Sequence, residues 1–154
     1  MAAFATIISL SNPVLQSYIV HSIILALKLL SVSTLTTLTR QYLKVFSNTE
    51  DAKFFKGNVK FDDPIVERTR RAHLNDLENI PAFWIIAAFY VTTNPTALLA
   101  VMLFRVYTVC RIVHTLVYAL FSCPQPIRAI AYAIPYLIKW YMGLQVVLYY
   151  ITSI

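Results

Sequence analysis

The chain has 154 residues, of which 58% are hydrophobic and 13% are charged, and its mean hydropathy is +0.64. This composition is much more apolar than that of soluble domains, so it predicts one membrane-embedded domain over residues 1–154 and excludes a soluble enzyme. The net charge is +6, but the basic residues form no patch that is separate from the apolar segments. We therefore expect no nucleic-acid partner.

The glycine, cysteine and histidine residues show which kinds of binding site the sequence does not contain. The only glycines are Gly57 and Gly143, so the sequence has no Gly-rich phosphate-binding loop. Cys110 and Cys123 lack the spacing of a zinc cluster, and none of the three histidines has a second ligand at a suitable position on its own helix face. We expect no metal cofactor.

Four apolar segments approach or exceed the ~20 residues needed to cross a hydrocarbon core. Each segment is preceded by a capping residue followed by proline, at Asn12-Pro13, Asp63-Pro64, Asn94-Pro95 and, more weakly, Gln125-Pro126. We expect transmembrane spans at about 13–39, 74–92, 96–122 and 127–152. The uncharged N-terminal residues are expected to be the start of the first span. The predicted fold class is an all-α integral membrane four-helix bundle.

The basic residues are concentrated in one region of the chain. Eight of the thirteen lie in the loop expected over residues 40–63 or in the helix start that follows it: Arg40, Lys44, Lys53, Lys56, Lys60, Arg68, Arg70 and Arg71. Cytosolic loops of membrane proteins carry an excess of Lys and Arg. The sequence therefore predicts that this loop and the turn before the fourth span face the cytosol, and that both termini face the other side.

Three helices are expected to present polar faces near this cytosolic side. The stretch 67–80 (ERTRRAHLNDLENI) places Arg71, Asn75 and Glu78 on one face. In the third span, Arg111, His114 and Tyr118 share one helix face. In the fourth span, Arg128, Tyr132 and Tyr136 share one helix face.

Two interpretations of these faces stay open on residue patterns alone. In a purely structural role, Glu78 neutralises Arg111 and the tyrosines form an interfacial belt. In a binding role, the surplus of arginines over the acids Asp76 and Glu78 holds a small zwitterion with more than one carboxylate. Lys28, Arg105, Arg111 and Lys139 lie in or near the spans, and each needs a partner, water or access to the interface.

The motifs KVFSNTED, ERTRRAHLNDLEN, FRVYTVCRIVHTLVY and PQPIRA resemble the glutathione transferase branch of the membrane-associated proteins in eicosanoid and glutathione metabolism, the MAPEG family. The resemblance extends from about Arg40 to Tyr132. It implies a homotrimer that binds glutathione between subunits at the cytosolic face. The implied glutathione contacts are Arg40, Arg71, His73, Asn75, Glu78, His114, Tyr118, Arg128 and Tyr132.

The resemblance also implies that Arg128 is catalytic and stabilises the glutathione thiolate. The implied activity is conjugation of glutathione to lipophilic electrophiles, a detoxifying reaction, with reduction of lipid hydroperoxides as a second reaction. The implied location is the microsomal membrane of the endoplasmic reticulum, and also the mitochondrial outer membrane. Ala52 stands where transferases of this branch carry cysteine, which puts activation through a thiol there in question.

Other functions are less well supported by these residues. Leu74 and Ala129 differ from the arginine and serine of prostaglandin E synthase, which disfavours an eicosanoid synthase of the prostaglandin E or leukotriene C4 type. A non-catalytic lipid-presenting protein has no need for Arg71, Arg111 and Arg128 together. A channel or transporter would have polar faces along the whole span.

Overall fold

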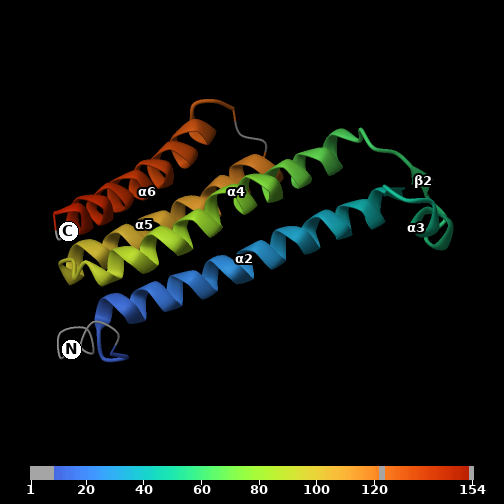
Figure 1. Cartoon of the computed structure of the whole chain (residues 1–154). Coiled ribbons are helices and arrows are strands. Elements are labelled where there is room, and N and C mark those ends of the chain that lie inside the picture. The colour runs from blue at the N-terminus through green and yellow to red at the C-terminus, as the bar shows by residue number, and fades with distance from the viewer. Residues whose placement is uncertain (1–8, 122–123, 153–154) are drawn as a thin grey trace.

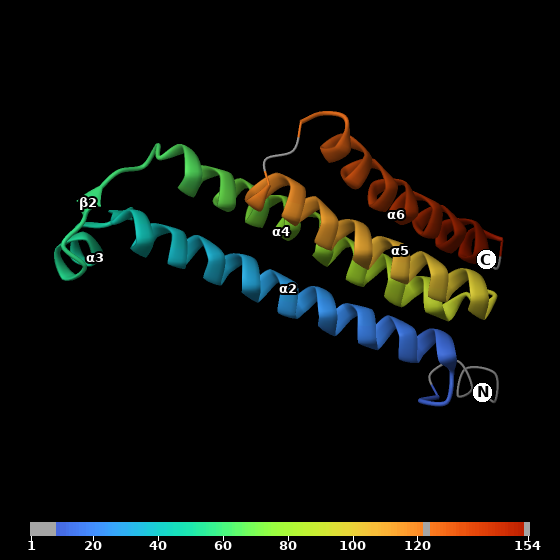
Figure 2. The ribbon, with the colours of Figure 1, turned by 180° about the vertical axis from the view of Figure 1, so that it is seen from behind.

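The structure, a computed structural model, describes residues 9–121 and 124–152. Its long helices are α2 (Pro13–Leu43), α4 (Pro64–Thr92), α5 (Ala97–Thr115) and α6 (Ile127–Ile151). They run lengthwise beside one another, as both views of the ribbon show (Figure 1, Figure 2). Helices α2 and α6 each pack against both α4 and α5. The prediction of a helical fold is confirmed.

Two of the four expected helix starts are confirmed in detail. The Asn12 side chain accepts a hydrogen bond from the backbone N–H of Val14, and the Asp63 side chain accepts from Ile65 and Val66. In each case proline occupies the first helical position, where a missing N–H costs nothing. The backbone N–H of Val66, aided by that of Ile65 and by Lys60, lowers the pKa of Asp63.

The other two starts differ from the expectation. Asn94 adopts a left-handed backbone with φ of 52° just after α4, a conformation typical of residues that end helices, so it does not cap α5. Helix α5 begins instead after Thr96, and α6 after Pro126, in both cases without a side-chain cap. Helix α2 also continues to Leu43, so Arg40 lies in its last turn and not at the start of the loop.

Two of the described helices are long and apolar enough to cross a membrane by themselves, Pro13–Leu43 and the helix formed by α5 with its continuation, Ala97–Leu120. The continuation is the π-helix η1 (Leu116–Leu120). Residue 122, the expected end of this span, lies outside the described residues, as does the expected start of the first span before residue 9. Helix α4 carries many charged side chains in its first half, and these face the other helices or lie exposed.

The connection from α2 to α4 is a small folded unit at one end of the long helices (Figure 1). Strands β1 (Val45–Phe46) and β2 (Asn58–Val59) pair in parallel, and α3 (Thr49–Phe54) lies between them in sequence. A Cβ atom on Gly57 would lie 2.4 Å from the Lys44 carbonyl oxygen, so only glycine permits this close approach. The sequence did not predict this structure within the 40–63 loop.

The apolar core contains aromatic side chains from three helices. Phe83 of α4 stacks on Tyr107 of α5 with ring centroids 4.0 Å apart, and Phe104 packs edge-on against both Phe83 and Tyr18. Such contacts fix the relative positions of the helices more specifically than aliphatic packing does. The Tyr107 hydroxyl donates to the backbone carbonyl of Asn79 at 2.9 Å, and this bond marks the start of a buried polar layer.

Candidate active site

A cluster of charged side chains is buried between α2, α4 and α5. Asp76 of α4 accepts hydrogen bonds from the ammonium of Lys28 on α2 and from the guanidinium of Arg111 on α5. Thr115 also donates to this carboxylate, at 3.3 Å. Among the described residues Asp76 is the one buried acid, so two cations share its charge. The cluster joins three helices at the level where the polar faces were expected.

The structural interpretation of the sequence named the wrong carboxylate. Glu78 is exposed and makes no recorded ion pair within the described part of the chain, whereas Asp76 neutralises Arg111. The two acids are two residues apart on a helix and therefore point to different sides. Asp76 faces the neighbouring helices, and Glu78 shares the outward face with Arg71, which is also exposed.

A pocket of about 230 Å³ opens beside this cluster, between the end of α5 and the start of α6. It is lined by Ala129 and Gln125 together with four residues of the predicted site: His114, Tyr118, Arg128 and Tyr132. Two helices that are separated by the α5–α6 turn thus bring together the residues that the sequence placed on two different polar faces.

The side chains of the pocket form an aromatic wall next to one cation. The rings of His114 and Tyr118 stack with centroids 5.7 Å apart, and Tyr132 lies 6.3 Å from His114. The guanidinium carbon of Arg128 lies 5.7 Å from the centre of the Tyr118 ring, within the range of cation–π attraction. Tyr118 belongs to the π-helix η1, a kind of irregularity that is frequent at functional sites.

Several predicted site residues carry buried nitrogen atoms that lack a hydrogen-bond partner among the described residues. These atoms are one terminal nitrogen of Arg40, Nδ1 of His73, Nδ1 of His114 and Nε of Arg128. Buried polar atoms are normally satisfied. Two of these unsatisfied atoms, on His114 and Arg128, belong to residues that line the pocket, so they indicate a place for a ligand group that is not part of the chain. An anionic or carbonyl-rich ligand has the matching chemistry.

The remaining predicted residues lie on α2 and α4, outside the pocket lining. Asn75 is half-buried, and its side-chain oxygen accepts from Arg111 at 2.9 Å, which ties it to the Asp76 cluster. Arg40 and His73 are half-buried, and Arg71 and Glu78 are exposed. The single chain therefore brings four of the nine residues together and leaves the face of Arg71 and Glu78 open.

Sequence reasoning missed the partners of the charges in the spans. It identified Lys28, Arg111 and Lys139 as needing partners, but it did not identify Asp76 as the shared acceptor or Asn79 as the acceptor for Lys139. A usable signal was present, because Asp76 and Asn79 are three residues apart and so lie on one helix face. Arg105, the fourth such cation, is exposed.

These features define a class of protein: a mainly helical integral membrane protein with a cationic, aromatic-walled pocket near one end of its helices. The chain belongs to the MAPEG family, whose family model matches residues 18–148. The resemblance drawn from the motifs is thereby confirmed.

Individual relatives agree with this assignment. Microsomal glutathione S-transferase 1 of Mus musculus is 42% identical over 132 residues, which cover 82% of this chain and 84% of the relative. The protein of the same name from Homo sapiens is 38% identical over 133 residues with the same coverage. Prostaglandin E synthase of Homo sapiens is 35% identical over 139 residues, covering 89% of this chain and 90% of the relative.

Proposed function

We propose that this protein is a membrane-bound glutathione transferase, with glutathione bound at the pocket between α5 and α6. The observation that carries the proposal is Arg128, which lines the pocket, faces Tyr118, and has an Nε atom without a partner in the described chain. The similarity to microsomal glutathione S-transferase 1 supports the same cosubstrate.

Arg128 has the chemistry that thiol activation needs. The nucleophile in conjugation is the thiolate, and a nearby cation lowers the pKa of a thiol and raises the reactive fraction. A guanidinium keeps its charge at any physiological pH, so it stabilises the anion without competing for the proton. The hydroxyl groups of Tyr118 and Tyr132 line the same pocket and are available as further donors to the sulfur.

A second copy of the chain would complete the binding site. Glutathione has two carboxylates and one ammonium, whereas the pocket of one chain offers Arg128 as its cation. Arg71 and Glu78 lie on an exposed face of α4. The Arg71 guanidinium could bind a carboxylate of glutathione, and the Glu78 carboxylate could bind its ammonium. We propose that this face of one subunit meets the pocket of the next in a homotrimer, with Arg40, His73 and Asn75 as further contacts.

The second substrate would be a lipophilic electrophile that arrives from the bilayer, or a lipid hydroperoxide that the same thiolate reduces. In this arrangement the four long helices cross the membrane, and the α2–α4 connection and the glutathione pocket face the cytosol. The membrane would be that of the endoplasmic reticulum, and also the mitochondrial outer membrane.

Prostaglandin E synthase activity is the second candidate, because the human synthase is 35% identical over nearly the whole of both chains. The pocket itself favours the transferase. Ala129 lines it and supplies no hydroxyl beside Arg128, and Leu74 on α4 supplies no second arginine.

The test uses the purified full-length protein in lipid nanodiscs with glutathione. Three substrates are compared: an aromatic halide electrophile, a fatty-acid hydroperoxide and the endoperoxide precursor of prostaglandin E. The proposal expects glutathione-dependent turnover of the first or second. Prostaglandin E formation without turnover of the electrophile or the hydroperoxide would establish the synthase instead. Glutathione binding without turnover of any of the three substrates would contradict the proposal that the protein is an enzyme.

A further inference from the structure

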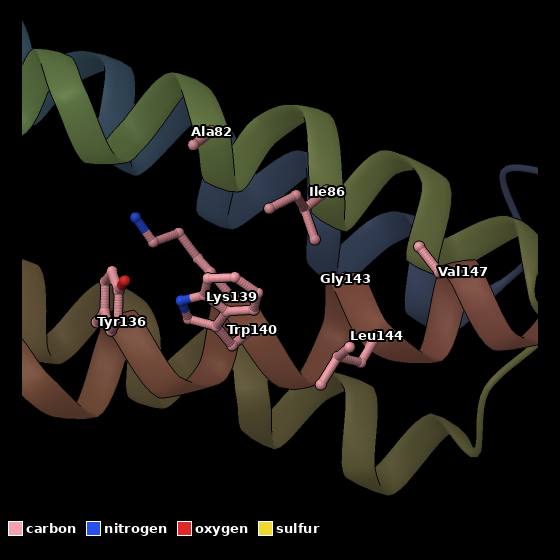
Figure 3. A pocket seen from close by; sticks show the side chains of 8 residues that line it. All are labelled: Ala82, Ile86, Tyr136, Lys139, Trp140, Gly143, Leu144 and Val147. Carbon is pink, nitrogen blue, oxygen red and sulfur yellow. The ribbon is translucent and has the colours of Figure 1, made fainter.

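The surfaces of the single chain divide into those that the proposed trimer covers and those that it leaves free. Figure 3 shows an apolar pocket between α4 and α6, with Ala82 and Ile86 on its α4 side. These two residues continue the face of Arg71 and Glu78 along α4, so this pocket belongs to the proposed subunit contact. The connection from α2 to α4 lies at the end of the bundle, away from this pocket (Figure 1).

One part of that connection combines aromatic and basic side chains. Residues 52–61 (AKFFKGNVKF) contain three phenylalanines and three lysines but no acid, and we call them the basic aromatic segment. Phe54 is 81% exposed and Phe61 is 68% exposed, and the lysines are exposed as well. Exposed apolar rings interleaved with lysines are typical of protein segments that lie in a membrane–water interface.

The position of Phe54 is fixed by a series of ring contacts. Phe46 of β1 is buried, at 4% exposure, and stacks on Phe55 with ring centroids 5.3 Å apart. Phe55 in turn packs edge-on against Phe54, with centroids 4.9 Å apart. A buried ring therefore supports an exposed one through a single intermediate. A ring that is already held in place loses little conformational entropy when a partner covers it.

The acids of the connection lie outside the basic aromatic segment. Glu50 and Asp51 are in the first turn of α3, before the segment begins. Asp63 caps α4 after the segment ends, and its carboxylate lies 3.6 Å from the ammonium of Lys60. Lys53 and Lys56 have no such carboxylate in the ion pairs of the described chain. The exposed end of α3 is therefore positively charged around Phe54.

The lengths of the helices place this segment near the headgroup layer of a bilayer. Helices α2 and α4 have 31 and 29 residues, whereas α6 has 25. At 1.5 Å per residue these are roughly 46, 43 and 37 Å. Both views show α2 and α4 extending past α5 and α6 at the end that carries the connection (Figure 1, Figure 2). Since the hydrocarbon layer is about 30 Å thick and the bilayer about 40–45 Å with its headgroups, this extension reaches headgroup level.

The segment also lies on a side of the bundle that the proposed subunit contact leaves free. Figures 1 and 2 both show α3 beyond the end of α2, on the side away from α6. Leu38 and Tyr42 are exposed on the last turns of α2 and line an apolar recess of about 330 Å³ together with Ile65. Arg40, which the proposed trimer places at the glutathione site, is two residues from each and so lies on another side of α2. An apolar helix face thus leads towards the basic aromatic segment.

We propose that the basic aromatic segment binds the headgroup layer of the protein's own bilayer where that layer contains anionic phospholipid. The rings of Phe54 and Phe61 enter the layer, and the three lysines pair with the negative charges of the lipid headgroups. Each lysine near an anionic surface strengthens binding roughly five-fold, so the contact depends strongly on lipid charge. Contact between two copies of the segment is disfavoured, because it would bring lysines together.

The test places a single fluorescent reporter at the exposed ring. The chain has two tryptophans, so full-length protein with Trp84→Phe, Trp140→Phe and Phe54→Trp has one tryptophan, at position 54. This protein is reconstituted without glutathione in nanodiscs of phosphatidylcholine or of equimolar phosphatidylcholine and phosphatidylserine. Each lipid is used with and without a phospholipid that carries a spin label on its headgroup. Both leaflets have the same composition, so the result does not depend on the orientation of the protein.

Phosphatidylserine is expected to shift the emission to shorter wavelength and to raise quenching by the spin label about two-fold or more. High salt should reverse both effects, because it screens the exposed lysines. In the reporter protein, the combined changes Lys53→Gln, Lys56→Gln and Lys60→Gln should abolish the dependence on phosphatidylserine. The matched control is Arg70→Gln, which removes an exposed cation that lies outside the connection and pairs with Glu67, and it should keep the dependence.

Equal quenching in the two lipids, or a dependence on phosphatidylserine that survives in the triple lysine variant, would overturn the proposal. Short-wavelength emission that is the same in both lipids and escapes the spin label would show that another subunit covers the ring, which would also overturn it. If a variant does not fold, hydrogen exchange of the wild-type protein decides. Phosphatidylserine should slow exchange at residues 52–61, and unchanged exchange there would contradict the contact. Because glutathione is absent, the outcome is independent of the proposed transferase activity.

Discussion

Arg111 of α5 donates from its guanidinium to the carboxylate of Asp76 on α4, and both side chains are almost fully buried, at 1% and 0% exposure. The same carboxylate accepts from Lys28 of α2. The same terminal nitrogen of Arg111 also holds Asn75, a predicted glutathione contact, at 2.9 Å. One acid therefore links three helices and positions a residue of the candidate site.

Replacing Asp76 by asparagine should destabilise the protein by about 3 kcal/mol or more, because it leaves two buried cations without a carboxylate. Thermal unfolding in detergent measures this effect. The matched control is Glu67→Gln, which breaks the exposed Glu67–Arg70 pair at 3.1 Å and should cost less than about 1 kcal/mol. Similar losses in the two variants would show that the buried cluster contributes no special stability.

Gly57 should be far less tolerant of substitution than Gly143. An added Cβ at Gly57 would lie 2.4 Å from the Lys44 carbonyl oxygen, so Gly57→Ala should loosen the β1–β2 connection. The exposed Lys53 and Lys56 should then be cleaved faster by trypsin, because proteolysis follows local opening. Gly143→Ala should leave cleavage unchanged, and equal cleavage in both variants would mean that the connection adapts to a side chain.

The sequence predicts the long helices well because their signals are local. Asparagine or aspartate before proline marks two helix starts correctly, and apolar length marks the helix bodies. The same signal fails at Asn94, where the side chain's tolerance of a left-handed backbone ends one helix instead of starting the next. Asparagine is favoured both at the start of a helix and just after its end, and the local sequence does not distinguish the two positions.

The site is predictable only in part, for a different reason. Helical spacing places His114, Tyr118, Arg128 and Tyr132 on two polar faces, and the structure brings those faces together around one pocket. Spacing does not say which of two nearby acids points inwards, so it favoured Glu78 where Asp76 is buried. That choice depends on the rotation of α4 against α2 and α5, which is a property of tertiary packing.

The distribution of basic residues predicts the orientation in the membrane. Protease added to intact microsomes should cut the α2–α4 connection near Lys53, Lys56 or Lys60, all of which are exposed. A tag on the C-terminus should stay protected until the membrane is opened with detergent. Protection of the connection together with loss of the tag would reverse the orientation and place the pocket on the other side.

Arg71 and Glu78 should contribute to glutathione affinity although they lie outside the pocket of their own chain. Arg71→Ala or Glu78→Gln should weaken binding by roughly 1.5–3 kcal/mol, the scale of a hydrogen bond to a charged group. Calorimetry with the intact oligomer measures this loss. Arg70→Ala is the matched control, because Arg70 is exposed on the same helix and pairs with Glu67. Unchanged affinity in both site variants would remove this face from the binding site.

Arg128 should act on chemistry more than on binding. Arg128→Leu removes the cation of the pocket, and each unit of thiol pKa that it controls is worth about 1.4 kcal/mol, so conjugation should slow by about ten-fold or more. Glutathione affinity should change less than turnover, because other contacts hold the peptide. Arg128→Lys should recover part of the rate, since lysine restores charge but not the planar guanidinium.

The most direct measurement is the ultraviolet absorbance of the glutathione thiolate in the complex at neutral pH, recorded for wild type and for Arg128→Leu at saturating glutathione. We expect wild type to form the thiolate, and we expect the variant to bind glutathione as the neutral thiol without this absorbance. A full thiolate signal in the variant, together with conjugation at the wild-type rate, would contradict the role of Arg128 and assign the sulfur to Tyr118 or Tyr132.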